Sequence, residues 1–171
     1  MVIMSGKRIT FETVEKAVRK KSFGVLTTID SKERPHSTGI IYAVGRPESS
    51  FALYCIVGEN YAKVRNIRQN PNVSLVVTFP HYWIRLVPAS YAMFRGTAEI
   101  LPDNDSDGRW AMSQSRIGRM NLQTDTDEEL VYIKMTPEPT VFCFGVSIGL
   151  MELRRHHESA MYKVTIPSDR K

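Results

Sequence analysis

A short predicted helix carries a cation at the end where its backbone attracts anions. Residues 60–70, NYAKVRNIRQN, place apolar side chains at helical spacing, with Asn60 as the expected cap. Lys63 would then lie in the first turn, where a cation opposes the positive end of the helix dipole. The free backbone N–H groups of that turn also form an anion site. The pattern predicts either that Lys63 binds a phosphate, to which Arg65 and Arg68 could contribute, or that Lys63 only reaches into solvent.

A second stretch, PHSTGIIYAV at residues 35–44, alternates small polar residues along an otherwise apolar strand. His36 and Thr38 would lie on one face of this strand, and Ser37 and Gly39 on the other. A glycine inside a strand loses packing and often marks the close approach of a ligand or of another backbone. The pattern therefore predicts either a binding surface or a bend without a ligand.

Length and composition favour one globular domain over residues 1–171. The chain has a mass of 19.5 kDa, with 42% hydrophobic and 24% charged residues. No apolar stretch approaches the ~20 residues that span a bilayer, and the first residues lack the pattern of a secretory signal. Cys55 and Cys143 lie in apolar runs, which indicates buried thiols. We therefore expect a cytoplasmic protein that does not enter a membrane.

The positive charge is concentrated in the first part of the chain. Residues 1–70 hold twelve Lys and Arg against six Asp and Glu, although the net charge of the whole chain is only +5. This distribution favours an anionic ligand, with a solvated basic surface as the alternative. Nucleic acid is not favoured, because the basic residues are not interleaved with aromatic ones.

The succession of elements predicts an antiparallel β fold. Strand-like runs follow one another with turn residues between them, which favours a barrel over alternating strands and helices. Further helices are expected at residues 11–21 and 109–122, a loop at 101–108, and a bulge or bend at Gly96. The expected strands are residues 23–30, 35–44, 51–57, 73–79, 90–100, 131–135, 140–146 and 161–166.

These elements, in this order, resemble the pyridoxamine 5′-phosphate oxidase-like, FMN-binding split-barrel family. The resemblance covers roughly residues 10–102, and its most specific part is Lys-x-x-Asn-Ile-x-x-Asn-Pro-x-Val-Ser-Leu at residues 63–75. It implies a mainly β fold, a six-stranded antiparallel split β-barrel with a few flanking helices. It also implies a homodimer that holds FMN, or alternatively a deazaflavin cofactor, between its subunits.

The resemblance also assigns residues. Lys63 corresponds to the lysine that contacts the cofactor phosphate, and Tyr61 and Ala62 lead into the phosphate-binding turn. Two strands would line the phosphate and the flavin ring: Ser37, Thr38, Gly39 and Ile40 on one, and Cys55, Ile56 and Val57 on its neighbour.

The chain departs from the true pyridoxamine phosphate oxidases at several of these positions. They carry Arg-x-Val-Leu-Leu-Lys on the second strand, where this chain has Thr38 and Ala43 in place of the Arg and the Lys. They also carry Ser-Arg-Lys where this chain has Tyr61-Ala62-Lys63. Half of the usual phosphate contacts are therefore missing, which implies either weaker binding or replacement of those contacts by Arg65 or Arg95.

The resemblance implies an oxidoreductase that transfers hydride or electrons between a reduced nicotinamide or deazaflavin donor and a small organic substrate. No convincing general acid or base is visible, so no catalytic residue is assigned. The C-terminal stretch 151–171 lacks the elements that hold the substrate phosphate in true pyridoxamine phosphate oxidases, so efficient turnover of that substrate is not expected. The alternatives are a non-catalytic flavin-binding or carrier protein, a deazaflavin- or haem-binding member of the same fold, and a basic nucleic-acid-binding protein.

Three other features carry less information. His156 and His157 would point apart on a strand, so we expect no metal site there. Phe79, Tyr82 and Trp83 suit the core or a dimer interface, with a wall stacked on the flavin ring as the alternative. The acidic run at residues 124–129 is expected to be a solvated loop.

Overall fold

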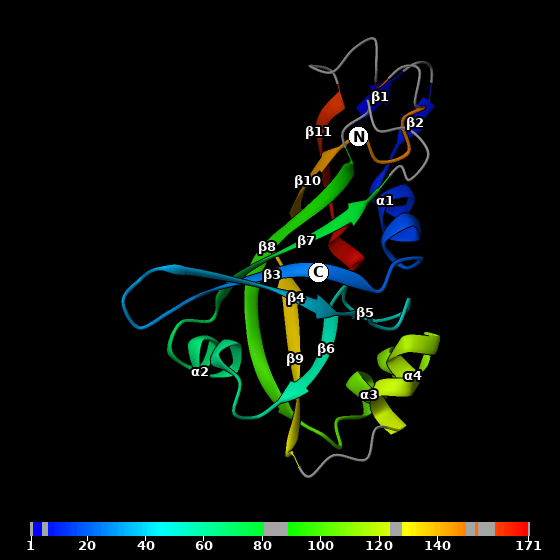
Figure 1. The fold of residues 1–171 in the computed structure, drawn as a ribbon. Coiled ribbons are helices and arrows are strands. Elements are labelled where there is room, and N and C mark those ends of the chain that lie inside the picture. The colour runs from blue at the N-terminus through cyan, green and yellow to red at the C-terminus, as the bar shows by residue number, and fades with distance from the viewer. Residues whose placement is uncertain are drawn as a thin grey trace.

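Six antiparallel strands form the body of the fold (Figure 1). Their spatial order is β4-β3-β7-β8-β9-β6, and β5, β10 and β11 extend the same sheet to nine strands. The expected mainly β, antiparallel split barrel with flanking helices is confirmed. The computed structural model describes residues 2–4, 7–80, 89–123, 128–149, 153 and 160–170.

The strands have these bounds: β3 Phe23–Ile29, β4 Pro35–Ile41, β5 Ala43–Val44, β6 Leu53–Gly58, β7 Asn72–Phe79, β8 Ser90–Pro102, β9 Leu130–Pro137, β10 Thr140–Phe144 and β11 Met161–Thr165. A separate two-stranded sheet consists of β1 (Val2–Met4) and β2 (Lys7–Ile9). The helices are α1 (Phe11–Val18), α2 (Ala62–Gln69), α3 (Ser106–Ser113), α4 (Arg116–Gln123) and a 3₁₀ turn at Ser168–Arg170.

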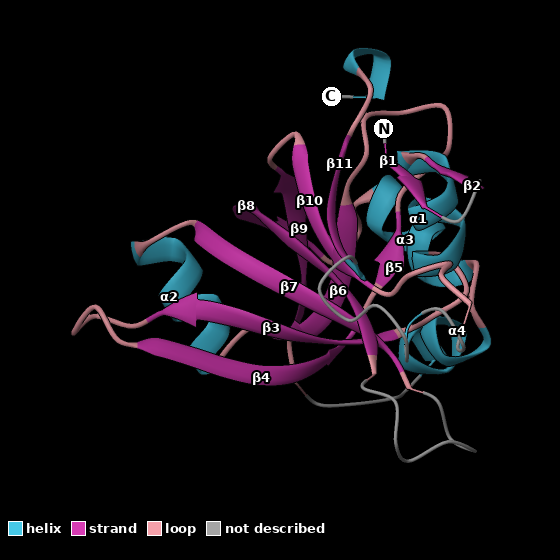
Figure 2. Cartoon of the chain, turned by 90° about the horizontal axis from the view of Figure 1, so that it is seen from above, coloured by secondary structure: helices cyan, strands magenta, loops and turns pink. Residues whose placement is uncertain are grey.

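The helices lie on two sides of the sheet. Viewed from above, α2 lies beside one end of β3, β4 and β7, while α1, α3 and α4 gather at the opposite side (Figure 2). Alternate strand residues point into the barrel, where Leu26, Leu75 and Phe94 are almost completely buried. A second, smaller core under α3 and α4 includes Met112 and Tyr132.

Two expectations for the connecting segments were wrong in detail. The single helix expected at 109–122 is two helices, because the Ser115 hydroxyl accepts a hydrogen bond from the Gly118 N–H and starts a new one. The loop expected at 101–108 is shorter, since β8 continues to Pro102 and Asp105 caps α3 through the Gly108 N–H at 2.7 Å.

Of the bulge or bend expected at Gly96, the bulge is absent. The pairing register runs through Gly96 without an extra residue, opposite Val73 on β7 and Pro137 on β9. A Cβ at this position would lie 2.1 Å from the Thr136 carbonyl oxygen. Glycine is therefore required there by the close approach of a neighbouring backbone.

The strand expected at 35–44 is divided at Tyr42. This residue is fully buried, and its hydroxyl donates to the Val18 carbonyl oxygen at 2.7 Å. Its N–H donates to the Ser22 carbonyl oxygen. The chain thus bends from β4 into the short β5, which pairs with the first residues of β6.

Candidate functional site

The barrel is open between β4 and β6. These two strands approach one another, yet they do not pair within the part of the chain that the structure describes. Backbone N–H and C=O groups on the facing edges therefore lack a strand partner and are available to a ligand. A cavity of about 370 Å³ lies at this opening.

The cavity collects six of the ten predicted site residues. The cavity is lined by residues of β4 and β6, the start of α2, α4, and the segment that leads into β9: Gly39, Ile40, Ile41, Ile56, Val57, Gly58, Tyr61, Lys63, Asn121, Glu128 and Leu130. The wall therefore combines five aliphatic side chains with the polar side chains of Tyr61, Lys63, Asn121 and Glu128, a mixture that suits a small molecule with apolar and polar parts.

Four predicted residues do not line this cavity. The exposed Ser37 forms a 2.8 Å hydrogen bond between its hydroxyl and that of Thr27. The Thr38 hydroxyl oxygen is buried and has no hydrogen-bond partner in the described residues. The Cys55 side chain is buried in the barrel core, and this burial raises the pKa of its thiol to about 12. Ala62 is the first residue of α2.

Lys63 lies in the first turn of α2, as expected, although the N-cap is Tyr61 and not Asn60. No side chain caps this helix, so its first N–H groups are not satisfied in the usual way. Val64 and Ile67 fix the helix against the barrel core, and the Asn66 amide donates to the buried Thr28 hydroxyl at 2.9 Å. The helix start is thus held beside the open edge of β6.

The electrostatic environment of Lys63 suits an anion. Its ammonium nitrogen lies 5.3 Å from the centre of the Tyr61 ring, within the range of a cation–π contact. Burial lowers the pKa of Lys63, and the nearby Cys55 acts in the opposite direction. Lys63 forms no ion pair with a carboxylate in the described residues. A bound anion would supply the missing counter-charge.

The arginines proposed as further phosphate contacts point elsewhere. Arg65 donates to the carbonyl oxygen of Asn60, and Arg68 pairs with Glu59. Arg95 lies 4.7 Å over the ring of Phe142 on the outside of the sheet. Over the described residues, Lys63 is therefore the only cation that lines the cavity.

The structure shows why residue 39 is a glycine, which the sequence alone did not reveal. A Cβ at this position would lie 2.9 Å from the ring of Phe23 on the neighbouring strand. The glycine thus makes room for an aromatic ring, and not for another backbone. Phe23 is 52% exposed, so it extends an apolar surface from the cavity wall to the outside of the sheet.

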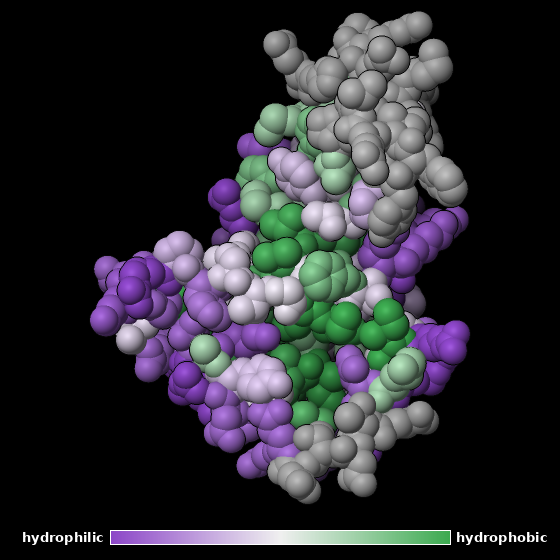
Figure 3. Space-filling view, in the orientation of Figure 1, coloured by the Kyte–Doolittle hydropathy of each residue, from purple (hydrophilic) through white to green (hydrophobic). Residues whose placement is uncertain are grey.

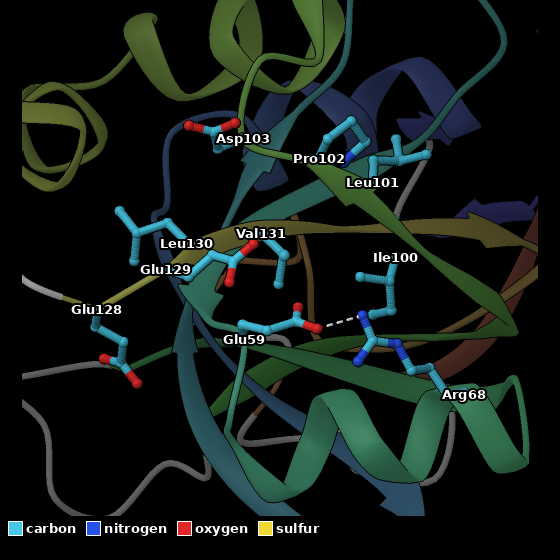
Figure 4. Close-up of a pocket in the computed structure, with 10 residues that line it drawn as sticks. All are labelled: Glu59, Arg68, Ile100, Leu101, Pro102, Asp103, Glu128, Glu129, Leu130 and Val131. Atoms are coloured by element: carbon cyan, nitrogen blue, oxygen red, sulfur yellow. Dashed lines mark ion pairs between the residues drawn. The ribbon is translucent and has the colours of Figure 1, made fainter.

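A larger cavity of about 590 Å³ lies beyond the shared wall residues Glu128 and Leu130. Figure 4 shows the Glu59, Asp103 and Glu129 side chains in this region, with the Glu59–Arg68 ion pair at its centre. Its lining holds four carboxylates and one arginine. The negative potential of that lining opposes a phosphate, so the smaller cavity is the better candidate for an anionic cofactor.

No histidine reaches the smaller cavity from the described residues. His36 lies on β4 with a buried Nδ1 that lacks a partner, away from the lining. The predictions for Tyr82, Trp83, His156 and His157 lie outside the described residues, as does most of the acidic run. Within the described chain, no three His, Cys, Asp or Glu side chains gather as a metal site would require.

Comparison with known proteins agrees with this architecture. A family model described as pyridoxamine 5′-phosphate oxidase matches residues 10–142. A haem-binding protein from Mycobacterium smegmatis superposes with a TM-score of 0.66 at 14% identity, over 93% of this chain and 59% of that one. The haem storage protein HutZ from Vibrio cholerae gives a TM-score of 0.61 at 17% identity, over 81% and 97%. An F420 reductase gives 0.51 at 22% identity, over 72% and 92%. Because all three identities are below 25%, these superpositions show a shared fold alone.

Proposed function

The chain belongs to the pyridoxamine 5′-phosphate oxidase family of split-barrel proteins, and from that premise we propose that it is an FMN-binding oxidoreductase. The cofactor would lie in the cavity between β4 and β6. The reaction would transfer hydride or electrons between a reduced nicotinamide or deazaflavin donor and a small organic substrate. The observation that carries the proposal is the position of Lys63 at an uncapped helix start inside this cavity.

The residues of the cavity fit the parts of FMN. Lys63 and the first N–H groups of α2 offer donors to the phosphate. Aliphatic side chains such as Ile41, Ile56 and Leu130 offer apolar contacts to the flat ring. The unpaired backbone edges of β4 and β6 offer hydrogen bonds to the polar edge of the ring.

FMN supplies the redox chemistry when it is bound. The residues of this chain bind it, orient it and exclude water from one side of its ring. Glu128 and Tyr61 are the cavity residues with titratable side chains besides Lys63 and are the residues available to influence charge near the ring. We assign no proton-transfer role to them, because neither is placed against a reacting atom.

We also propose that a second copy of the chain covers the outer face of the sheet. Val25, Val76 and Met93 form a continuous apolar row with Gly39 across the strands β4, β3, β7 and β8, and they are partly exposed. Figure 3 shows a hydrophobic band through the middle of this view of the molecule. Because Gly39 also lines the cavity, a partner on this face would reach the cofactor.

One observation favours a deazaflavin as the second candidate cofactor. The described lining of the cavity offers one cation, Lys63, together with the carboxylate Glu128. The phosphate monoester of FMN carries a charge of about −1.5 to −2 at neutral pH. The phosphate of the deazaflavin cofactor is a phosphodiester with one ionisable oxygen, so a single cation matches its charge. The similarity to an F420 reductase is consistent with this candidate.

We also propose that the protein is cytoplasmic. Both cysteines are free and buried, as suits a reducing compartment. No helix of the described chain is long and apolar enough to cross a membrane.

The test is a titration of the purified protein, freed of any bound cofactor, with FMN, riboflavin and the deazaflavin cofactor. We expect FMN to bind with a stoichiometry near one per chain. We also expect NADPH or a reduced deazaflavin to reduce the bound FMN. Flavin that binds but is never reduced by any donor would identify a carrier. Absence of binding for all three ligands would refute the proposal.

A further inference from the structure

The loop from Gly58 to Tyr61 connects β6 to α2 and contributes to both cavities. Gly58 and Tyr61 line the smaller cavity, and Glu59 lines the larger one. Within the loop, the Tyr61 N–H donates to the Gly58 carbonyl oxygen at 3.2 Å. The Glu59 N–H connects the loop to the residue before β9, since it donates to the Glu129 carbonyl oxygen at 2.8 Å. The position of this loop therefore decides where the Tyr61 ring and the start of α2 lie.

The start of α2 lacks the side-chain cap that usually fixes such a position. A capping Ser, Thr, Asp or Asn contributes about 1 kcal/mol to a helix, and here Tyr61 provides no such hydrogen bond. The first turn also contains no acidic residue to complement the helix dipole. Something else must hold the loop against the helix.

Two arginines of α2 reach back to the loop that precedes the helix. The Arg65 guanidinium donates to the carbonyl oxygen of Asn60. The Arg68 guanidinium, from the last turn of α2, pairs with the carboxylate of Glu59. Figure 4 shows Arg68 and Glu59 turned toward one another across the larger cavity.

We propose that Arg65 and Arg68 are positioning residues that fix the Gly58–Tyr61 loop and thereby place Tyr61 and Lys63 at the cofactor cavity. This inference builds on the proposed function, in that the loop matters because the cavity binds a flavin. It also explains why a helix of eight residues carries three cations and no acid. Lys63 faces the cavity, while the other two cations face the loop and act through it.

The binding test separates positioning from direct contact. An arginine that touches the phosphate would affect FMN and spare riboflavin, which has no phosphate. A positioning arginine affects both ligands. We expect Arg68→Gln and Glu59→Gln each to weaken FMN and riboflavin binding by the same factor, about twofold to fivefold. The double variant should be no weaker than either single one, because both remove the same ion pair.

Hydrogen exchange gives a readout that needs no flavin. Amides of residues 58–62 should exchange faster than in the wild type in Arg68→Gln and in Arg65→Gln. In Arg65→Lys they should exchange as slowly as in the wild type, because lysine keeps a donor for the Asn60 carbonyl oxygen. Arg34→Gln is the matched control. Arg34 pairs with Asp30 in the distant β3–β4 turn with similar exposure, 66% and 23% against 51% and 22% for Arg68 and Glu59.

Two results would overturn the inference. One is unchanged exchange of the 58–62 amides in both arginine variants, whether or not the protein binds flavin. The other is a loss of affinity confined to FMN, which would make the arginine a phosphate ligand. Failure of the wild-type protein to bind any flavin would instead refute the proposed function, and the exchange measurement would still decide the role of the two arginines.

Discussion

The ammonium nitrogen of Lys63 lies 5.3 Å from the centre of the Tyr61 ring, where β6 passes into α2. The ring covers one side of the cation, and the aliphatic wall of the cavity removes water from another. The pKa of Lys63 is lowered as a result, because the charged form has lost hydration. A phosphate that enters the cavity would restore the favourable environment of the charge.

Lys63→Ala is expected to weaken FMN binding by about 1.5–3 kcal/mol, the usual range for a hydrogen bond to a charged group. Riboflavin should lose much less, because it has no phosphate to contact. Fluorescence titration with both ligands measures the difference. Lys32→Ala, in the exposed β3–β4 turn, is the control and should leave both affinities unchanged. Equal losses of affinity for the two ligands would show that Lys63 does not contact the phosphate.

The affinity for FMN is expected to fall as the pH rises from neutral toward the ordinary lysine pKa. The phosphate is already fully charged above about pH 7, since its second pKa is about 6. The change in affinity therefore follows Lys63, whose lowered pKa makes it lose its proton earlier than an exposed lysine. Lys63→Arg keeps its charge throughout this range, so its FMN affinity should be flat. A falling affinity in that variant would assign the pH dependence to another group.

Met93→Glu is expected to convert a dimer into monomers. Met93 is the β8 member of the apolar row on the outer face of the sheet, and it lies between Val76 on β7 and Phe142 on β10. Burial of a carboxylate at that position is costly without a partner. Sedimentation of the wild type at micromolar concentration should give twice 19.5 kDa. Lys32→Glu, in the exposed β3–β4 turn, is the control; a monomeric wild type that binds FMN tightly would contradict the dimer.

Tyr132→Phe is expected to leave the free energy of unfolding unchanged or to raise it by up to about 1 kcal/mol. The Tyr132 hydroxyl is buried, and it has no hydrogen-bond partner among the described residues. Tyr42→Phe is the matched comparison, since it removes the 2.7 Å hydrogen bond to Val18 and should cost about 1 kcal/mol. Urea unfolding of the two variants measures both values. A clear destabilisation by Tyr132→Phe would mean that the hydroxyl is satisfied in the folded protein.

The sequence predicted the strands well because their signal is local. Alternation of buried and exposed residues, together with the turn residues between them, is visible in the segments that became β3, β7 and β8. The position of Lys63 was also predictable, because helix spacing and Pro71 fix where α2 lies.

The features that the sequence did not predict correctly depend on contacts that only the folded chain makes, several of them between residues far apart in the sequence. The sequence predicted a bulge or a bend at Gly96, whereas the structure shows that the glycine is required by the nearby Thr136 carbonyl oxygen. The sequence predicted Arg65 as a phosphate contact, whereas in the structure its guanidinium donates to the Asn60 carbonyl oxygen. Glu128 joins the cavity only because β9 pairs with β6, a pairing across more than seventy residues that no local pattern reveals.

The central claim is that the opening between β4 and β6 binds a flavin through Lys63. The most direct measurement is a titration of FMN into the cofactor-free protein, followed by the visible absorbance of the flavin and by hydrogen exchange of residues 39–41 and 56–63. The account predicts saturable binding near one FMN per chain, with new protection of the amides in both segments. Binding that protects neither segment, or no binding at all, would contradict it.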